Sequence, residues 1–176
     1  IFVVDPLYTL PYVFILIRLA FLKRGNLKRN KLNWIGIIVT SCYLLFTVAN
    51  KQIVNENFKA FAKEDNLEVL NIDSRPMPLQ NILWTANIET PESFYIYYYS
   101  HFDSKRQKGY SIPKNHSWLT PYLIDDRTKK LIKISEGYYA IAEHPEKGIL
   151  FNDLRFGQLN GFNNRKSTFV FAYHLY

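Results

Sequence analysis

The stretch LNWIGIIVTSCYLLFTVAN, from Leu32 to Asn50, decides which kind of fold this chain can adopt. It contains no charged residue and lies between Lys31 and Lys51. An α-helix needs about 20 consecutive apolar residues to cross a hydrocarbon core roughly 30 Å thick. The stretch therefore predicts a membrane-spanning helix. Its polar residues Thr40, Tyr43, Thr47 and Asn50 recur at spacings of three and four, which places them on one face that packs on other segments.

A second apolar segment, from Pro6 to Leu22, precedes the first. Asp5 before Pro6 is typical of a helix start, because an Asp side chain caps free N–H groups and Pro is tolerated at the first helical position. The connecting loop, residues 23–33, carries five Lys and Arg residues and no acid. We expect residues 1–50 to form a membrane helical hairpin.

Two residues complicate the first segment. Pro11 indicates either a later helix start, near Thr9, or a kink. Arg18 must face a polar partner or extend toward the membrane interface, because a charged side chain is costly in hydrocarbon. The segment is therefore expected to pack in a bundle of helices.

Residues 51–176 predict an extramembrane α+β domain with a mainly antiparallel sheet. An amphipathic stretch at 52–66 is expected to continue the membrane helix outward, and a helical rhythm covers residues 119–134, with Pro121 near its start. The expected strands are Leu67–Ile72, Ile82–Glu89, Ser93–Phe102, Gly109–Ile112, Gly137–Glu143, Ile149–Phe156 and Ser167–Tyr176.

The charge is concentrated in one place. The chain has a net charge of +7, but five of its 22 basic residues lie in the loop 23–33. The rest is only mildly basic, so its charge is a weak argument for a nucleic-acid partner. A basic loop tends to stay in the cytoplasm, so residues 51–176 are expected on the extracytoplasmic side of the membrane, which in a didermic bacterium would be the periplasm. Because the chain begins at Ile1 with no signal peptide, we expect it to be a fragment of a longer protein.

Asp5 is the one acid of the first 50 residues and is our candidate catalytic or metal-binding residue. The competing interpretation is a simple helix cap. In the second half, Asp153 and Arg155 point to the same side of a strand, which predicts either a structural ion pair or a substrate- or partner-binding site. His101, His116, His144 and His174 show no metal-binding spacing, and the lone Cys42 cannot form a disulfide framework. They are expected to be structural or solvated.

The run FYIYYYSHF, residues 94–102, invites two interpretations. Aromatic side chains on an exposed sheet can stack on bases of RNA. The run lacks interleaved Arg or Lys, however, so a strand with aromatic residues on both faces is the plainer interpretation.

Several segments occur in the order found in one family: FVVDPLYTLPYV at 2–13, the uncharged segment 34–49, PLQNILWTANIE at 78–89, GILFNDLRFG at 148–157 and FVFAY at 169–173. Together they resemble the bacterial inner-membrane-associated, metal-dependent hydrolases that are also called the LexA-binding hydrolase family. The resemblance covers nearly the whole chain. DPLYTLP and DLRFG are its most specific pieces.

The resemblance implies the C-terminal part of a membrane-bound hydrolase that acts on phosphoester or phospholipid-type substrates. It implies a divalent metal, with zinc the ion suggested by a distant relation to phospholipase C-like enzymes. Asp5 is the position that matches a metal or active-site role, and the other ligands would lie upstream of this chain. The main alternative is a non-enzymatic, membrane-anchored module that binds a protein or lipid partner. A weaker one is a soluble nucleic-acid binder whose apolar segments are core helices.

Overall fold

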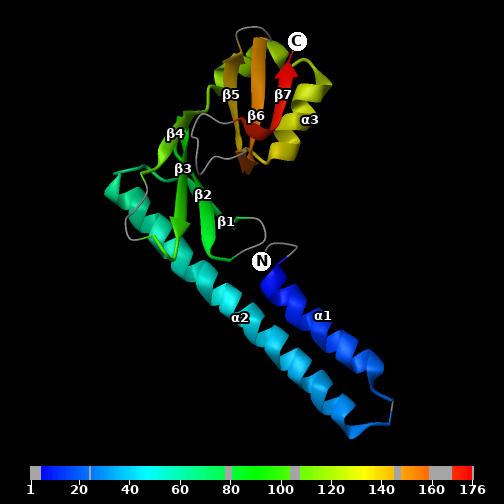
Figure 1. Ribbon diagram of the computed structural model, residues 1–176. Coiled ribbons are helices and arrows are strands. Elements are labelled where there is room, and N and C mark those ends of the chain that lie inside the picture. Colours follow the sequence, from blue (N-terminus) through cyan, green and yellow to red (C-terminus); the bar gives the residue numbers. More distant parts are fainter. Residues whose placement is uncertain are drawn as a thin grey trace. The chain divides into compact units, whose positions relative to one another are not determined.

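The computed structural model describes residues 5–23, 25–77, 81–103, 108–144, 148–158 and 168–175. The fold is α+β, with helices and two antiparallel sheets (Figure 1). The elements are α1 (Pro6–Phe21), α2 (Leu27–Glu64), β1 (Asn71–Pro76), β2 (Leu83–Glu89), β3 (Ser93–Ser100), β4 (Tyr110–Pro113), the 3-10 helix η1 (His116–Tyr122), α3 (Asp126–Ser135), β5 (Tyr139–His144), β6 (Gly148–Gln158) and β7 (Phe169–Leu175).

The chain forms two compact units. The first comprises Ile1–Phe61, Ser74–Thr85 and Tyr99–Arg106, and the second comprises Ala62–Asp73, Ala86–Tyr98 and Gln107–Tyr176. The predicted boundary at residue 50 falls inside α2, which continues without a break to Glu64.

Helix α1 begins where the sequence predicts. Asp5 is its N-cap, and its side chain accepts a hydrogen bond from the backbone N–H of Leu7 at 3.0 Å. Pro11 lies inside the helix and neither delays its start nor ends it. At its C-terminus, Arg29 donates a hydrogen bond to the carbonyl of Leu22, one of the acceptors that a helix end leaves unpaired.

Helix α2 is longer than predicted. It begins at Leu27 rather than Leu32, so part of the predicted basic loop is helical. Asn26 makes this early start favourable, because its side-chain oxygen accepts a hydrogen bond from the N–H of Lys28. Among the described residues, α2 is the one helix that is long and apolar enough to cross a membrane, judged by length and composition. Helix α1 has 16 residues and is shorter than such a span, so the structure supports one of the two predicted membrane spans.

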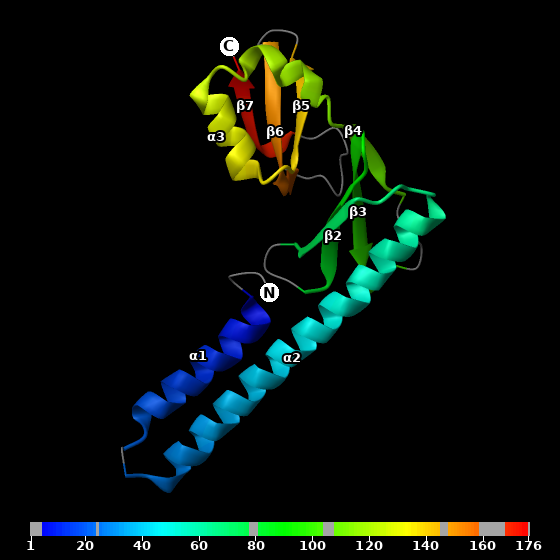
Figure 2. The same cartoon turned by 180° about the vertical axis from the view of Figure 1, so that it is seen from behind.

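Helices α1 and α2 nevertheless lie side by side, as both views show (Figures 1 and 2). The two helices approach closely at Gly36, which is buried. A Cβ atom at this position would lie 3.1 Å from Cγ2 of Ile15, so the absence of a side chain permits the contact.

The strands form two sheets where the sequence predicted one. The first has the order β1-β2-β3-β4 and the second β5-β6-β7. The chain segment between β4 and β5 contains η1 and α3, and this helical insertion separates the two sheets along the sequence. The single helix expected at 119–134 is divided, because Asp125 caps a new helix by accepting a hydrogen bond from the N–H of Arg127. Strand β1 begins at Asn71, four residues later than the predicted Leu67.

The core of the second unit lies between α3 and the β5-β6-β7 sheet. Strand β6 is central and pairs antiparallel with both neighbours, with Phe151 opposite Ile141 on one side and Tyr173 on the other. The buried cluster comprises Leu119, Tyr139, Ile141, Phe151 and Leu175, with Leu131 and Ile132 of α3 packed against it. A smaller cluster contains Phe94, Ala140 and Leu154.

Candidate functional site

The candidate site of the first unit is built around Asp5, which is only 2 % exposed. One carboxylate oxygen caps α1. The other accepts hydrogen bonds from the Tyr43 hydroxyl at 2.6 Å and from the Asn81 side-chain amide at 3.3 Å. One side chain thus joins α1, α2 and the segment before β2. Tyr8 of α1 lies beside Tyr43, with the two ring centroids 6.1 Å apart.

The hydrogen bonds continue beyond Asp5. Asn50 donates from its side-chain amide to the carbonyl of Asn81 at 2.8 Å, and its Oδ1 lies 2.6 Å from Nε2 of His101. Because Oδ1 is an acceptor, Nε2 must carry the proton. Nδ1 of a neutral His101 can then accept from the Tyr99 hydroxyl, 3.3 Å away. We call Asp5, Tyr43, Asn50, Asn81 and His101 the Asp5 network.

One atom of the Asp5 network is not satisfied. Oδ1 of Asn81 is buried and has no hydrogen-bond partner within the described part of the chain. Leaving a buried acceptor unpaired costs about 1–3 kcal/mol. A hydrogen-bond donor or a cation would remove that cost, so the polarity of the site suits a positively charged guest beside the Asp5 carboxylate.

The Asp5 network can supply part of a metal site but not a whole one. A carboxylate oxygen of Asp5 and the amide oxygen of Asn81 are hard ligands of the kind that divalent cations accept. Across the described ranges, however, no group of three or more His, Cys, Asp or Glu side chains is placed to hold a metal ion. A complete site would need ligands from outside these ranges.

The second predicted site, Asp153 and Arg155, is an ion pair on β6. Arg155 donates from Nε to one Asp153 oxygen at 3.1 Å and from a terminal nitrogen to the other at 2.8 Å. A carboxylate oxygen of Glu136 lies 3.6 Å from the second terminal nitrogen of Arg155. These hydrogen bonds to Asp153 raise the pKa of Arg155 above its ordinary value. Each group satisfies the other, which favours the structural interpretation, and a role in recognition stays a prediction.

The remaining histidines make local contacts. His116 stacks on the ring of Tyr139 at 4.0 Å and lies 2.9 Å from the Tyr139 carbonyl. His144 and His174 meet edge to face at 5.6 Å. Cys42 is exposed on α2.

The aromatic strand β3 is largely interior. Phe94, Ile96, Tyr97 and Tyr98 are buried, and the Tyr97 hydroxyl donates to Asp65 at 2.5 Å. A ring that is packed inside the protein cannot stack on a base without unfolding the strand.

Sequence reasoning found some members of the Asp5 network and missed others. The polar stripe on α2 pointed to Tyr43 and Asn50, which do contact other segments, whereas Thr40 and Thr47 bond back to carbonyls of their own helix. Asn81 gave no local signal, because its role depends on a contact with Asp5, 76 residues away in the chain.

Comparisons of the chain with protein-family models, with curated proteins and with solved structures found no match.

Proposed function

We propose that this chain is the C-terminal part of a membrane-bound, metal-dependent hydrolase that acts on phosphoester or phospholipid-type substrates. One observation carries the proposal. Segments on which the family resemblance rests meet at the buried carboxylate of Asp5: DPLYTLP contains Asp5, the uncharged stretch supplies Tyr43, and Asn81 begins the described part, residues 81–85, of PLQNILWT. A polar cluster assembled from distant, mostly apolar segments is expected at a functional site.

Asp5 is the candidate metal ligand and catalytic residue, with Asn81 beside it. The unsatisfied oxygen of Asn81 fits a cation at this place. A bound divalent metal, zinc by resemblance, would polarise a phosphoryl oxygen and activate water. Tyr43 orients the carboxylate by donating to one of its oxygens. The other ligands would come from upstream of Ile1.

The proposed location is the bacterial inner membrane. Helix α2 would span it, and α1 would pack beside α2 as part of a larger helical bundle. The basic end of the two helices would face the cytoplasm, and residues that follow α2 would lie on the extracytoplasmic side.

Substitution of Asp5 in the full-length protein tests the proposal. Asn in place of Asp5 can still cap α1, because Asn is an equally good N-cap, but it removes the negative charge. We expect Asp5→Asn to weaken metal binding at least about 10-fold in a metal titration. Glu56→Gln is the matched control, because it also replaces one carboxylate by an amide but at an exposed position of α2 outside the Asp5 network. Unchanged metal affinity in Asp5→Asn would overturn the assignment.

A turnover assay tests whether this chain is one part of the enzyme. Residues 1–176 alone should show no metal-dependent hydrolysis of a phosphodiester or phospholipid, whereas the full-length protein should. Equal rates for both would contradict the proposal.

A second function, a membrane-anchored module without catalysis, is favoured by a different observation. Both carboxylate oxygens of Asp5 already accept hydrogen bonds, as they would in a purely structural cluster. This module would bind a protein or lipid partner. The metal titration separates the two functions, because the module predicts no tight metal binding in the wild type.

A further inference from the structure

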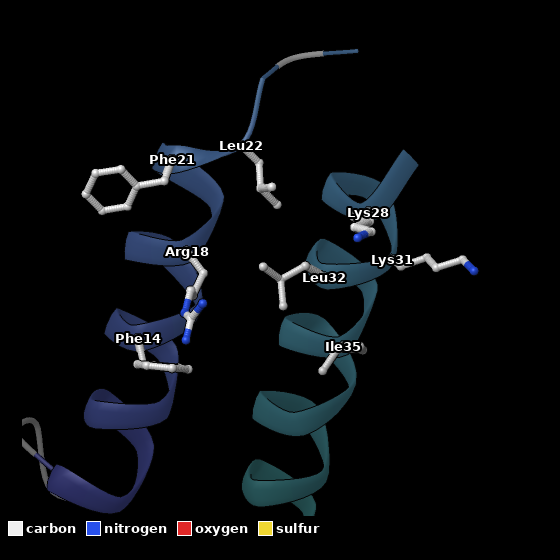
Figure 3. A pocket seen from close by; sticks show the side chains of 8 residues that line it. All are labelled: Phe14, Arg18, Phe21, Leu22, Lys28, Lys31, Leu32 and Ile35. Carbon is white, nitrogen blue, oxygen red and sulfur yellow. The ribbon is translucent and has the colours of Figure 1, made fainter. Parts of the chain in front are cut away.

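A pocket of about 470 Å³ lies between α1 and α2, near the connecting loop (Figure 3). Its lining is apolar and basic and contains no acid: Phe14, Arg18, Phe21, Leu22, Lys28, Lys31, Leu32 and Ile35. Phe14, Arg18 and Phe21 follow one another on α1 at spacings of four and three. Lys28, Leu32 and Ile35 do the same on α2, so each set occupies one helical face.

No acid of the described ranges forms an ion pair with Arg18. In Figure 3 its side chain runs along α1 toward Phe14, and its guanidinium carbon lies 5.2 Å from the centroid of the Phe14 ring. Neither Lys28 nor Lys31 makes an ion pair with any described residue, and the sequence contains no Asp or Glu from Pro6 to Asn55. Arg29 differs, because it is held by the Leu22 carbonyl. The pocket therefore gathers positive charge that no ion pair within the described part of the chain neutralises.

The position of the pocket along α2 indicates where the neutralising charge would come from. Lys31 is the last charged residue before the uncharged stretch, so the pocket lies at one end of the segment that is apolar enough to cross a membrane. Lipid phosphates lie at this level of a bilayer, and acyl chains begin just below. Arg in hydrocarbon costs several kcal/mol unless it reaches an anion or the interface.

We propose that this pocket binds one anionic phospholipid. The phosphate would lie between Arg18 and Lys28, with Lys31 at the rim, since its side chain points away from α1 in Figure 3. An acyl chain would pack on Phe14, Leu32 and Ile35. Basic pockets between membrane helices at the cytoplasmic side are known to hold anionic lipid headgroups. The proposal rests on the proposed insertion of α2 in a membrane and adds a specific ligand to it.

Native mass spectrometry of the chain in non-ionic detergent, with equal amounts of phosphatidylglycerol and phosphatidylcholine, tests the proposal. The wild type should retain phosphatidylglycerol in preference. Arg18→Gln and Lys28→Gln should each reduce that preference about five-fold. The matched control is Lys23→Gln, which removes the same charge from the same basic region but does not line the pocket. Circular dichroism would verify that each variant keeps its helices.

A second variant tests the apolar half of the pocket. Leu32→Trp fills the space without changing any charge and should lower lipid retention.

Equal retention of both lipids by the wild type, or a loss in Lys23→Gln equal to that in the pocket variants, would overturn the proposal. Displacement of the lipid by millimolar inorganic phosphate would also overturn it, since the site would then be a simple anion site. The two proposals can fail separately. Failure of the chain to enter membranes would refute the proposed membrane anchor, whereas the absence of a lipid preference in detergent would refute the lipid-binding pocket.

Discussion

Asp5 caps α1 through one carboxylate oxygen and accepts hydrogen bonds from Tyr43 and Asn81 through the other. The first role follows from its place before Pro6, because both residues favour a helix start. The second role depends on contacts with residues 38 and 76 positions away. A local pattern predicts the cap, and only the folded chain shows the network.

Two buried tyrosines, Tyr98 and Tyr139, make the stability of the protein depend on pH. Tyr139 lies between the rings of His116 and Phe151, with centroids 4.0 and 4.7 Å away, and Tyr98 is 8 % exposed on β3. Burial disfavours a phenolate, so desolvation raises the pKa of both Tyr98 and Tyr139 above 10.0.

We therefore predict a loss of stability at alkaline pH. Above pH 10 the unfolded chain releases tyrosine protons that the folded chain still holds, so the free energy of unfolding falls as pH rises. The slope should reach at most about 1.4 kcal/mol per pH unit for each tyrosine. Thermal unfolding at pH 9 to 11 measures it. The double variant Tyr98→Phe/Tyr139→Phe should show a shallower loss, and an equally steep one would contradict the explanation.

In strand β6, the alternation of side chains determines which residues share a face, and the folded structure determines which of them form bonds. The sequence places Asp153 and Arg155 on one side of the strand, and the structure joins them by two hydrogen bonds. The side chains are 5 % and 13 % exposed, so neither charge can return to water when the other is removed.

Asp153→Asn should accordingly be strongly destabilising. We expect the free energy of unfolding to fall by about 3 kcal/mol, because the guanidinium of Arg155 would remain buried without its main counter-charge. The exposed pair of Lys129 and Asp126 provides the control, and Lys129→Gln should change stability by less than about 0.5 kcal/mol. Similar small effects for both variants in thermal unfolding would show that the Asp153 pair is not structural and would revive its role in recognition.

Helix α2 carries the prediction that concerns the whole molecule, because the proposed anchor depends on it. Leu45 lies near the middle of the uncharged stretch and is 70 % exposed, as expected of a side chain that faces lipid. Leu45→Lys should raise the apparent free energy of membrane insertion by about 2.5–3.5 kcal/mol in a translocon insertion assay.

Ile53→Lys is the matched control for this insertion assay. Ile53 is also exposed on α2, at 56 %, but lies beyond Lys51 and outside the stretch. It should leave the insertion free energy nearly unchanged. Equal effects of the two substitutions would mean that the helix does not span a membrane along the predicted residues.

The sequence by itself determined the type and order of most elements. The uncharged stretch, the Asp-Pro helix start and the alternating strands gave α1, α2 and β2 to β7 with ends displaced by a few residues, because spacing and capping act within a few residues. The basic loop and the absence of acids from Pro6 to Asn55 also follow from the sequence alone.

Tertiary structure alone decided the rest. The division into two sheets, the meeting of Asp5 with Asn81 and the burial of the Asp153–Arg155 pair could not be read from local patterns. Each depends on which distant segments come together and on how far water is excluded there. A buried polar group without a partner is costly, so burial raises the energetic importance of each hydrogen bond or ion pair. Burial is a property of the folded chain.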